Sequence, residues 1–179
     1  MKRETLRAYL KRGGLIAYPT ESCFGLGCDP LNSRAVRKLA RLKGRPLGRG
    51  LILIADCFER FRHLVQPLDA DDLSRVTATW PGPVTWILPA RRRAPWLRGG
   101  KPGLAVRVTA HPPAARLCHE LRTALVSTSA NKSGGHPVKT ARECRKIFGA
   151  QVWVLGGRIG DRKRPSTLID LLSGEILRP

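Results

Sequence analysis

The sequence predicts a single layered α/β domain with a mixed sheet, and three observations lead to this fold class. The 179 residues fit one domain of ordinary size, and 42% apolar residues are enough for a substantial core. Short apolar runs alternate with helical patterns along the chain, which is typical of helices packed on a sheet. No internal repeat, linker or change of composition divides the sequence. Residues 1–179 are therefore expected to form one domain.

The chain opens with a predicted helix and a predicted strand. The helix covers residues 4–11 and ends at Gly13 and Gly14, since glycine readily adopts the backbone conformation that ends a helix. The apolar run 15–18 then reads as a buried strand, and Pro19 stops it.

A second helix follows residues 20–31, which read as a loop. Asn32 or Ser33 can cap this helix, and its apolar residues up to Leu42 face inward. Its other face carries four cations at helical spacing, either as a solvated surface or as a surface that meets RNA. These cations are Arg34, Arg37, Lys38 and Arg41.

The rest of the chain continues the alternation of strands and helices. Three aspartates favour the N-terminus of a helix over 69–80, which ends at Pro81. The other predicted strands cover 51–55, 84–88, 104–108, 124–127, 152–155, 167–170 and 175–177, and the other predicted helices cover 113–121 and 141–148.

The charge of the chain indicates a polyanionic partner. Lysine and arginine number 33 against 13 aspartates and glutamates, which gives a formal net charge of +20. Such an excess favours nucleotides or nucleic acid as partners, and it does not choose between them.

Cysteine usage and hydropathy indicate a cytoplasmic protein. The five cysteines are odd in number and contain no C-x-x-C pair, and no apolar leader opens the chain. No run approaches the ~20 apolar residues that span a bilayer. Cys23 and Cys28 lack a companion pair at zinc-finger spacing, so no metal site made by side chains alone is expected.

The loop 43–49 places three cations and two glycines between a helix and a strand. Glycine lets the backbone approach a ligand closely, so Lys43, Arg45 and Arg49 can meet phosphate there. Capping of the preceding helix by Lys43 and Arg45 explains the same residues equally well.

Three further loops carry small polar residues after apolar runs, at 19–27, 127–134 and 164–167. The sequence has no G-x-x-x-x-G-K-[ST], no G-x-G-x-x-G between a strand and a helix, and no G-x-S-x-G. The available lysine, arginine, hydroxyl and amide groups suit transfer at phosphorus, where positioning and charge neutralisation carry most of the catalysis.

Seven short motifs together resemble one family, the YrdC-like threonylcarbamoyl-AMP synthases of the short, single-domain bacterial type. Each string alone is weak, but their order and spacing are specific, and they extend over nearly the whole chain. They read AYPTES at 17–22, FGLGCD at 24–29, KGRP at 43–46, WPGPVT at 80–85, AVRV at 105–108, STSAN at 127–131 and PST at 165–167.

The resemblance implies a twisted, open mixed sheet with flanking helices around a deep basic cavity. It also implies an ATP-dependent reaction of L-threonine with bicarbonate, which gives threonylcarbamoyl-adenylate and pyrophosphate. The product would serve threonylcarbamoyl-adenosine formation in tRNA, so tRNA threonylcarbamoyl transferase proteins are expected downstream.

The family pattern assigns roles to individual residues. Lys43 and Arg45 would be catalytic and would bind ATP together with Arg49, Thr85, Ser129, Asn131 and Arg178. Threonine would be bound by Thr20, Arg107, Ser127 and Ser166. Mg²⁺ would be held mainly through the ATP phosphates, because few carboxylates lie near the cationic loop.

One departure from the family and one alternative function remain. Longer family members carry a histidine in the strand after the cationic loop, whereas this chain has Ile54, so one threonine contact lacks its usual residue. The alternative is a non-catalytic binder of double-stranded or structured RNA, and tRNA is a candidate partner in either case. The scarcity of aromatic residues, which make up 6% of the chain, argues against RNA recognition by stacking.

Overall fold

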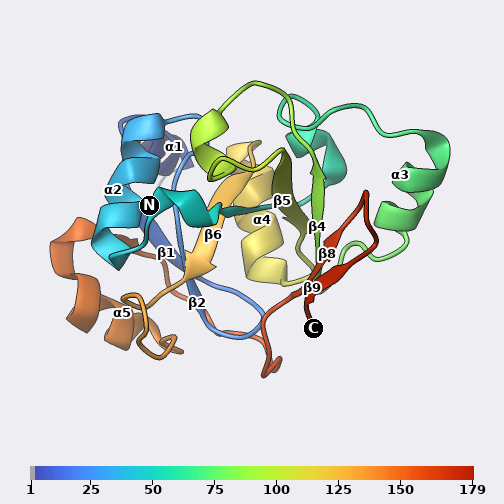
Figure 1. The fold of residues 1–179 in the computed structure, drawn as a ribbon. Coiled ribbons are helices and arrows are strands. Elements are labelled where there is room, and N and C mark those ends of the chain that lie inside the picture. Colours follow the sequence, from blue (N-terminus) through green and yellow to red (C-terminus); the bar gives the residue numbers. More distant parts are fainter. Residues whose placement is uncertain (1–2) are drawn as a thin grey trace.

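A computed structural model describes residues 3–179, and it confirms the α/β class with a mixed sheet (Figure 1). In the described residues the sheet has nine strands, in the order β7-β1-β2-β6-β3-β5-β4-β8-β9. The strands are β1 (Ile16–Pro19), β2 (Phe24–Gly27), β3 (Ile52–Ala55), β4 (Val84–Pro89), β5 (Gly103–Val108), β6 (Leu125–Ser129), β7 (Trp153–Val154), β8 (Thr167–Asp170) and β9 (Ile176–Arg178). The helices are α1 (Arg3–Lys11), α2 (Ser33–Lys43), α3 (Ala70–Thr77), α4 (Pro112–Leu121) and α5 (Ala141–Phe148).

The ends of α2 follow from its capping residues. The Asn32 side chain accepts a hydrogen bond from the Ala35 amide at 3.0 Å, which satisfies a free donor of the first turn. At the other end, Gly44 adopts a left-handed conformation with φ 62°, and the amide of Arg45 bonds the Ala40 carbonyl. This ending fixes the direction in which the cationic loop leaves the helix.

Two sequence predictions were wrong in detail. The loop predicted over 20–31 contains strand β2, which pairs antiparallel with β1 and with β6. Its Phe-Gly-Leu-Gly sequence has too few β-branched residues to signal a strand. The helix predicted over 69–80 begins after Asp69, which caps it, and ends at Thr77, and residues 78–83 form turns that lead into β4.

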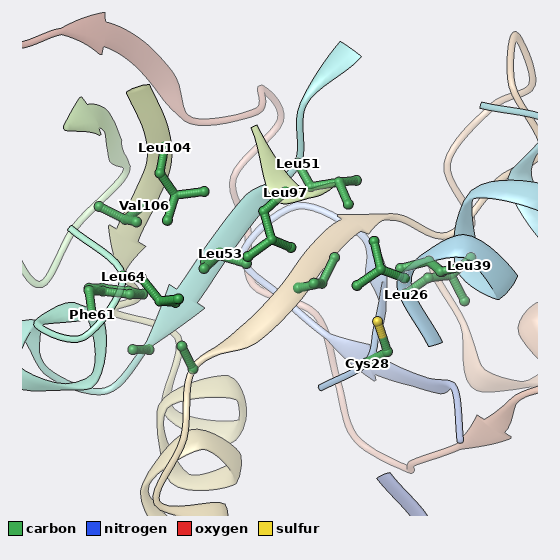
Figure 2. Close-up of a cluster of buried hydrophobic side chains, with 14 of the residues drawn as sticks. Leu26, Cys28, Leu39, Leu51, Leu53, Phe61, Leu64, Leu97, Leu104 and Val106 are labelled. Carbon is green, nitrogen blue, oxygen red and sulfur yellow. The ribbon is translucent and has the colours of Figure 1, made fainter. Parts of the chain in front are cut away.

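The side chains of β3 alternate between two hydrophobic clusters on opposite faces of the sheet. Leu53 and Ala55 belong to the larger cluster, which receives Val36 and Leu39 from α2 and Phe148 from α5. Figure 2 shows this cluster, with Leu53 of β3 and Leu39 of α2 labelled.

Ile54 belongs to the smaller cluster on the other face, which α1 and α4 cover. Leu10 of α1 and Leu117 and Leu121 of α4 pack there, beside Leu125 of β6. The larger cluster extends along both halves of the sheet, whereas the smaller one occupies only part of its face. The rest of that face is left for the cavity described next.

Candidate active site

A cavity of about 210 Å³ lies on the sheet face that also carries Ile54. Strands β2, β3, β5 and β6 contribute its floor, and the loops after β1 and α2 and before β8 contribute its walls. The lining residues are Thr20, Ser22, Cys23, Gly25, Arg45, Leu51, Ile52, Ile54, Arg107, Ser127, Thr128, Ser129, Pro165, Ser166 and Arg178.

Strand register explains why residues distant in sequence meet on this face. Gly25 pairs with Ser129, and Ile52 pairs with Ser127. Ile54 pairs in turn with Arg107. Because paired residues point to the same face and side chains alternate along each strand, these residues share one surface.

The structure brings most of the predicted site residues together around this cavity. From the predicted threonine set, all four residues line it: Thr20, Arg107, Ser127 and Ser166. From the predicted ATP set, Arg45, Ser129 and Arg178 line it. The remaining ones, Lys43, Arg49, Thr85 and Asn131, lie elsewhere, and each has a definite position.

Lys43 lies behind the cavity wall and is only 4% exposed. Its ammonium group donates hydrogen bonds to the carbonyl oxygens of Ser129 and Asn131, at 2.5 Å and 2.8 Å, and to Asn131 Oδ1 at 3.2 Å. Burial and then the charge of Arg45 lower the pKa of Lys43 to about 8. The side chain therefore holds the turn that follows β6 rather than lining the cavity.

The Asn131 side chain is committed to the same turn. Its amide nitrogen donates to the carbonyls of Lys132 and Gly135, and its oxygen accepts a hydrogen bond from the Ser129 hydroxyl at 2.6 Å. Lys43 and Asn131 together fix the position of Ser129, which does face the cavity.

Thr85 is fully buried and supports the opposite wall. Its hydroxyl lies 2.7 Å from the Ser166 hydroxyl. Arg178 donates to the Ser166 carbonyl from Nε and Nη2, at 3.0 Å and 2.8 Å. Two neighbours thus hold Ser166 in place at the cavity edge.

Arg49 lines a second cavity of about 360 Å³, which continues the first one along the sheet. The two cavities share Arg45 and Arg178. Ile87 and Ala105, which are paired in β4 and β5, line this extension, and Lys101 adds another cation.

The walls of the first cavity are strongly cationic. In the described part of the chain no carboxylate lines it, whereas Arg45, Arg107 and Arg178 do. Burial lowers the pKa of Arg178, and the charges of Arg107 and Arg45 lower it further. Burial and then Arg49 lower the pKa of Arg45. The positive charge of these three guanidinium groups suits an anion in the cavity.

Glu21 is the main residue that the sequence prediction missed. Its carboxylate forms an ion pair with Arg107, at 2.7 Å and 2.9 Å, and accepts a hydrogen bond from Thr109 at 2.7 Å. Burial alone would raise the pKa of Glu21, but Arg107 and the hydrogen bonds outweigh it and hold the pKa below its ordinary value. Its position next to Thr20, in a chain with few acids, was the available signal.

The described residues 3–179 contain neither a cluster of metal-binding side chains nor a membrane-spanning helix. No three side chains of the metal-binding types His, Cys, Asp or Glu gather closely enough to hold a metal ion. Over the same residues, no helix has the length and apolar character needed to cross a membrane.

The chain is similar to curated bacterial proteins over its whole length. The protein of Thiobacillus denitrificans is 62% identical over 174 residues, which are 97% of this chain and 93% of that protein. The protein of Methylobacillus flagellatus is 54% identical over 180 residues, and the aligned region covers 100% of this chain and 100% of that protein. Both relatives carry the name threonylcarbamoyl-AMP synthase.

Solved structures show the same fold. A variant of Sua5 from P. abyssi superposes with a TM-score of 0.87 at 30% identity, over 99% of this chain and 53% of that chain. P. abyssi Sua5 complexed with L-threonine superposes with a TM-score of 0.83. This chain thus spans about half the length of Sua5.

A family model extends this similarity to the sequence pattern. The model, named Sua5_yciO_yrdC and described as telomere recombination, matches residues 8–179. The chain therefore belongs to the Sua5–YciO–YrdC family.

Proposed function

We propose that this protein is a threonylcarbamoyl-AMP synthase, which forms threonylcarbamoyl-adenylate and pyrophosphate from L-threonine, bicarbonate and ATP. One observation carries the proposal: a single cavity is lined by all four predicted threonine residues and by Arg45, Ser129 and Arg178 of the predicted ATP residues. The names of the full-length relatives support the same reaction.

Threonine binds at the end of the cavity formed by Thr20, Arg107 and Ser127. Arg107 supplies positive charge for a carboxylate, and the two hydroxyls can exchange hydrogen bonds with a small polar ligand. Ile54 of β3 makes this part of the floor apolar, and the substrate's methyl group would lie against it. The structure of Sua5 with L-threonine supports a threonine site in this fold.

ATP binds along the other end, where Arg45, Ser129 and Arg178 meet the second cavity. Arg45, Arg49 and Arg178 neutralise the triphosphate, and Lys43 with Asn131 holds Ser129 in position for it. The lining side chains include no carboxylate for a direct metal ligand, so Mg²⁺ would enter on the phosphate oxygens of ATP. Bound there, it would supply further charge neutralisation.

The reaction follows from this arrangement. Threonine's amine and bicarbonate form a carbamate with loss of water, and a carbamate oxygen then attacks the α-phosphorus of ATP. The bond from that phosphorus to the bridging oxygen breaks, and pyrophosphate leaves with the electron pair. Fixed arginine donors stabilise the charge that develops on the leaving group, and they need little reorganisation to do so.

The setting of the reaction is part of the proposal. The product would be consumed by threonylcarbamoyl transfer to tRNA in the cytoplasm. The cationic stripe on α2, formed by Arg34, Arg37, Lys38 and Arg41, is exposed and would hold tRNA or another structured RNA. RNA binding without catalysis is the alternative, and it leaves the buried hydroxyl and arginine cluster without a role.

The test is a reconstitution with purified protein, L-threonine, ¹⁴C-bicarbonate, ATP and Mg²⁺. We expect pyrophosphate and a labelled adenylate, both dependent on threonine. Omission of threonine is the control. If no adenylate forms and the protein binds RNA in a salt-sensitive manner, the synthase function is wrong and non-catalytic RNA binding is the better interpretation.

A further inference from the structure

The ion pair between Arg107 and Glu21 lies at the threonine end of the cavity. The two side chains are 9% and 15% exposed, and both oxygens of Glu21 accept from Arg107. Glu21 is not a lining residue, whereas Arg107 is, so Arg107 lies between the carboxylate and the cavity.

This ion pair occupies one of the two forks that a guanidinium group can offer. Arginine has five N–H donors, and a carboxylate can bind either across Nη1 and Nη2 or across Nε and Nη2. Glu21 binds across Nη1 and Nη2. Nε is buried and, among the described residues, has no hydrogen-bond partner. The second hydrogens of Nη1 and Nη2 are therefore the donors left for a ligand.

Glu21 itself is held from two directions. The Thr109 hydroxyl donates to its Oε1, and its own carbonyl accepts a hydrogen bond from the Arg162 amide at 3.1 Å. The segment carrying Arg162 also bonds the Thr20 carbonyl through the Gly160 amide at 3.0 Å. The carboxylate is therefore fixed relative to β5 and to the loop that ends at Ser166.

We propose that Glu21 is a positioning residue for threonine recognition, which holds Arg107 so that the Nη hydrogens outside the ion pair meet the substrate's carboxylate. The inference rests on the proposed function. Glu21 does not touch the substrate; it fixes the orientation of the Arg107 guanidinium group at the cavity. Preorganisation of this kind lowers the cost of ordering a long side chain on binding.

The inference predicts an effect on threonine that exceeds the effect on ATP. In Glu21→Gln one acceptor becomes an amide donor facing Arg107, so the fork is lost and Arg107 becomes free to rotate. We expect KM for threonine to rise about tenfold, and KM for ATP to change less than about twofold. Glu21→Asp keeps the charge and should recover part of the loss. Asp71→Asn, an exposed residue of α3, is the matched control and should change neither KM.

Calorimetric titration with threonine alone provides a readout that needs no turnover. Weaker threonine binding by Glu21→Gln at unchanged ATP binding supports the inference. Equal losses for both substrates, or threonine binding as tight as in the unchanged protein, overturn it. Failure of the unchanged protein to form any adenylate would instead overturn the proposed function.

A second variant keeps the test decisive if Glu21→Gln does not fold. Thr109→Val has a similar shape and leaves the ion pair, but it removes the hydrogen bond to Glu21 and the acceptor of the His111 amide. We expect a smaller rise in KM for threonine, of about threefold, with KM for ATP unchanged. An unchanged KM for threonine in this folded variant would overturn the inference.

Discussion

The ammonium group of Lys43 donates to oxygen atoms of Ser129 and Asn131, so its protonation state controls the turn that follows β6. The pKa of Lys43 is lowered to about 8 from its ordinary 10.5, so the group loses its proton within an accessible pH range. We predict that kcat/KM for ATP falls as pH rises through about 8. The measurement is a pH profile of pyrophosphate release, because kcat/KM reports ionisations of the free protein.

Lys43→Met should lack this alkaline decline and should be slower by well over tenfold at neutral pH. Unfolding does not explain the decline. Between pH 8 and 10.5 the unfolded chain binds the proton at this site more tightly, so the Lys43 contribution to stability rises with pH. A decline of the same size in Lys43→Met would assign it to another group.

Residue types and spacing predicted which side chains belong to the site better than they predicted what each one contacts. Arg45 and Ser129 line the cavity as expected. Lys43 was expected among the cavity cations, but a long side chain at a helix end can turn either way, and neighbouring carbonyls decide the direction. The partner of Arg107 could not be foreseen, because Glu21 and Arg107 come from separate strands and loops 86 positions apart.

Strand β2 shows where sequence patterns fail for a whole element. Its two glycines suggest a loop, yet the packing of β2 between β1 and β6 requires a glycine at position 27. An added Cβ on Gly27 would lie 2.5 Å from the Val126 carbonyl oxygen and 2.9 Å from the Tyr18 ring. Helices and longer apolar strands were found because their periodicity is strong, whereas this strand depends on contacts that only the folded sheet reveals.

Gly27→Ala should therefore destabilise the sheet. The backbone oxygen of Val126 cannot move away without disturbing β6, so we expect a loss of roughly 1–3 kcal/mol in the free energy of unfolding. Urea unfolding measures it. Gly48→Ala is the matched control, because among the described residues no atom beyond its chain neighbours lies within 4 Å of a Cβ added there. Equal stability of the two variants would show that β2 tolerates a side chain at Gly27.

The cations of the molecule fall into two groups, the arginines that line the cavity and the exposed stripe on α2. The net charge is +20, but only a few arginines line the cavity. The stripe on α2 lies on the opposite side of that helix from Val36 and Leu39, which pack into the larger cluster. The sequence predicted this stripe from helical spacing alone, because exposure on an amphipathic helix follows directly from its period.

If the stripe holds tRNA, its removal should weaken RNA binding without affecting adenylate formation. Arg37→Gln combined with Arg41→Gln should lower the slope of log affinity against log salt by about one unit for each cation removed. Arg92→Gln combined with Arg116→Gln removes the same charge from exposed residues outside the stripe and should change the slope less. Equal slopes for the two double variants would show that RNA binding depends on net charge rather than on the α2 surface. A loss of adenylate formation in the first variant would contradict the separation of the two surfaces, because neither Arg37 nor Arg41 lines the cavity around Ser129.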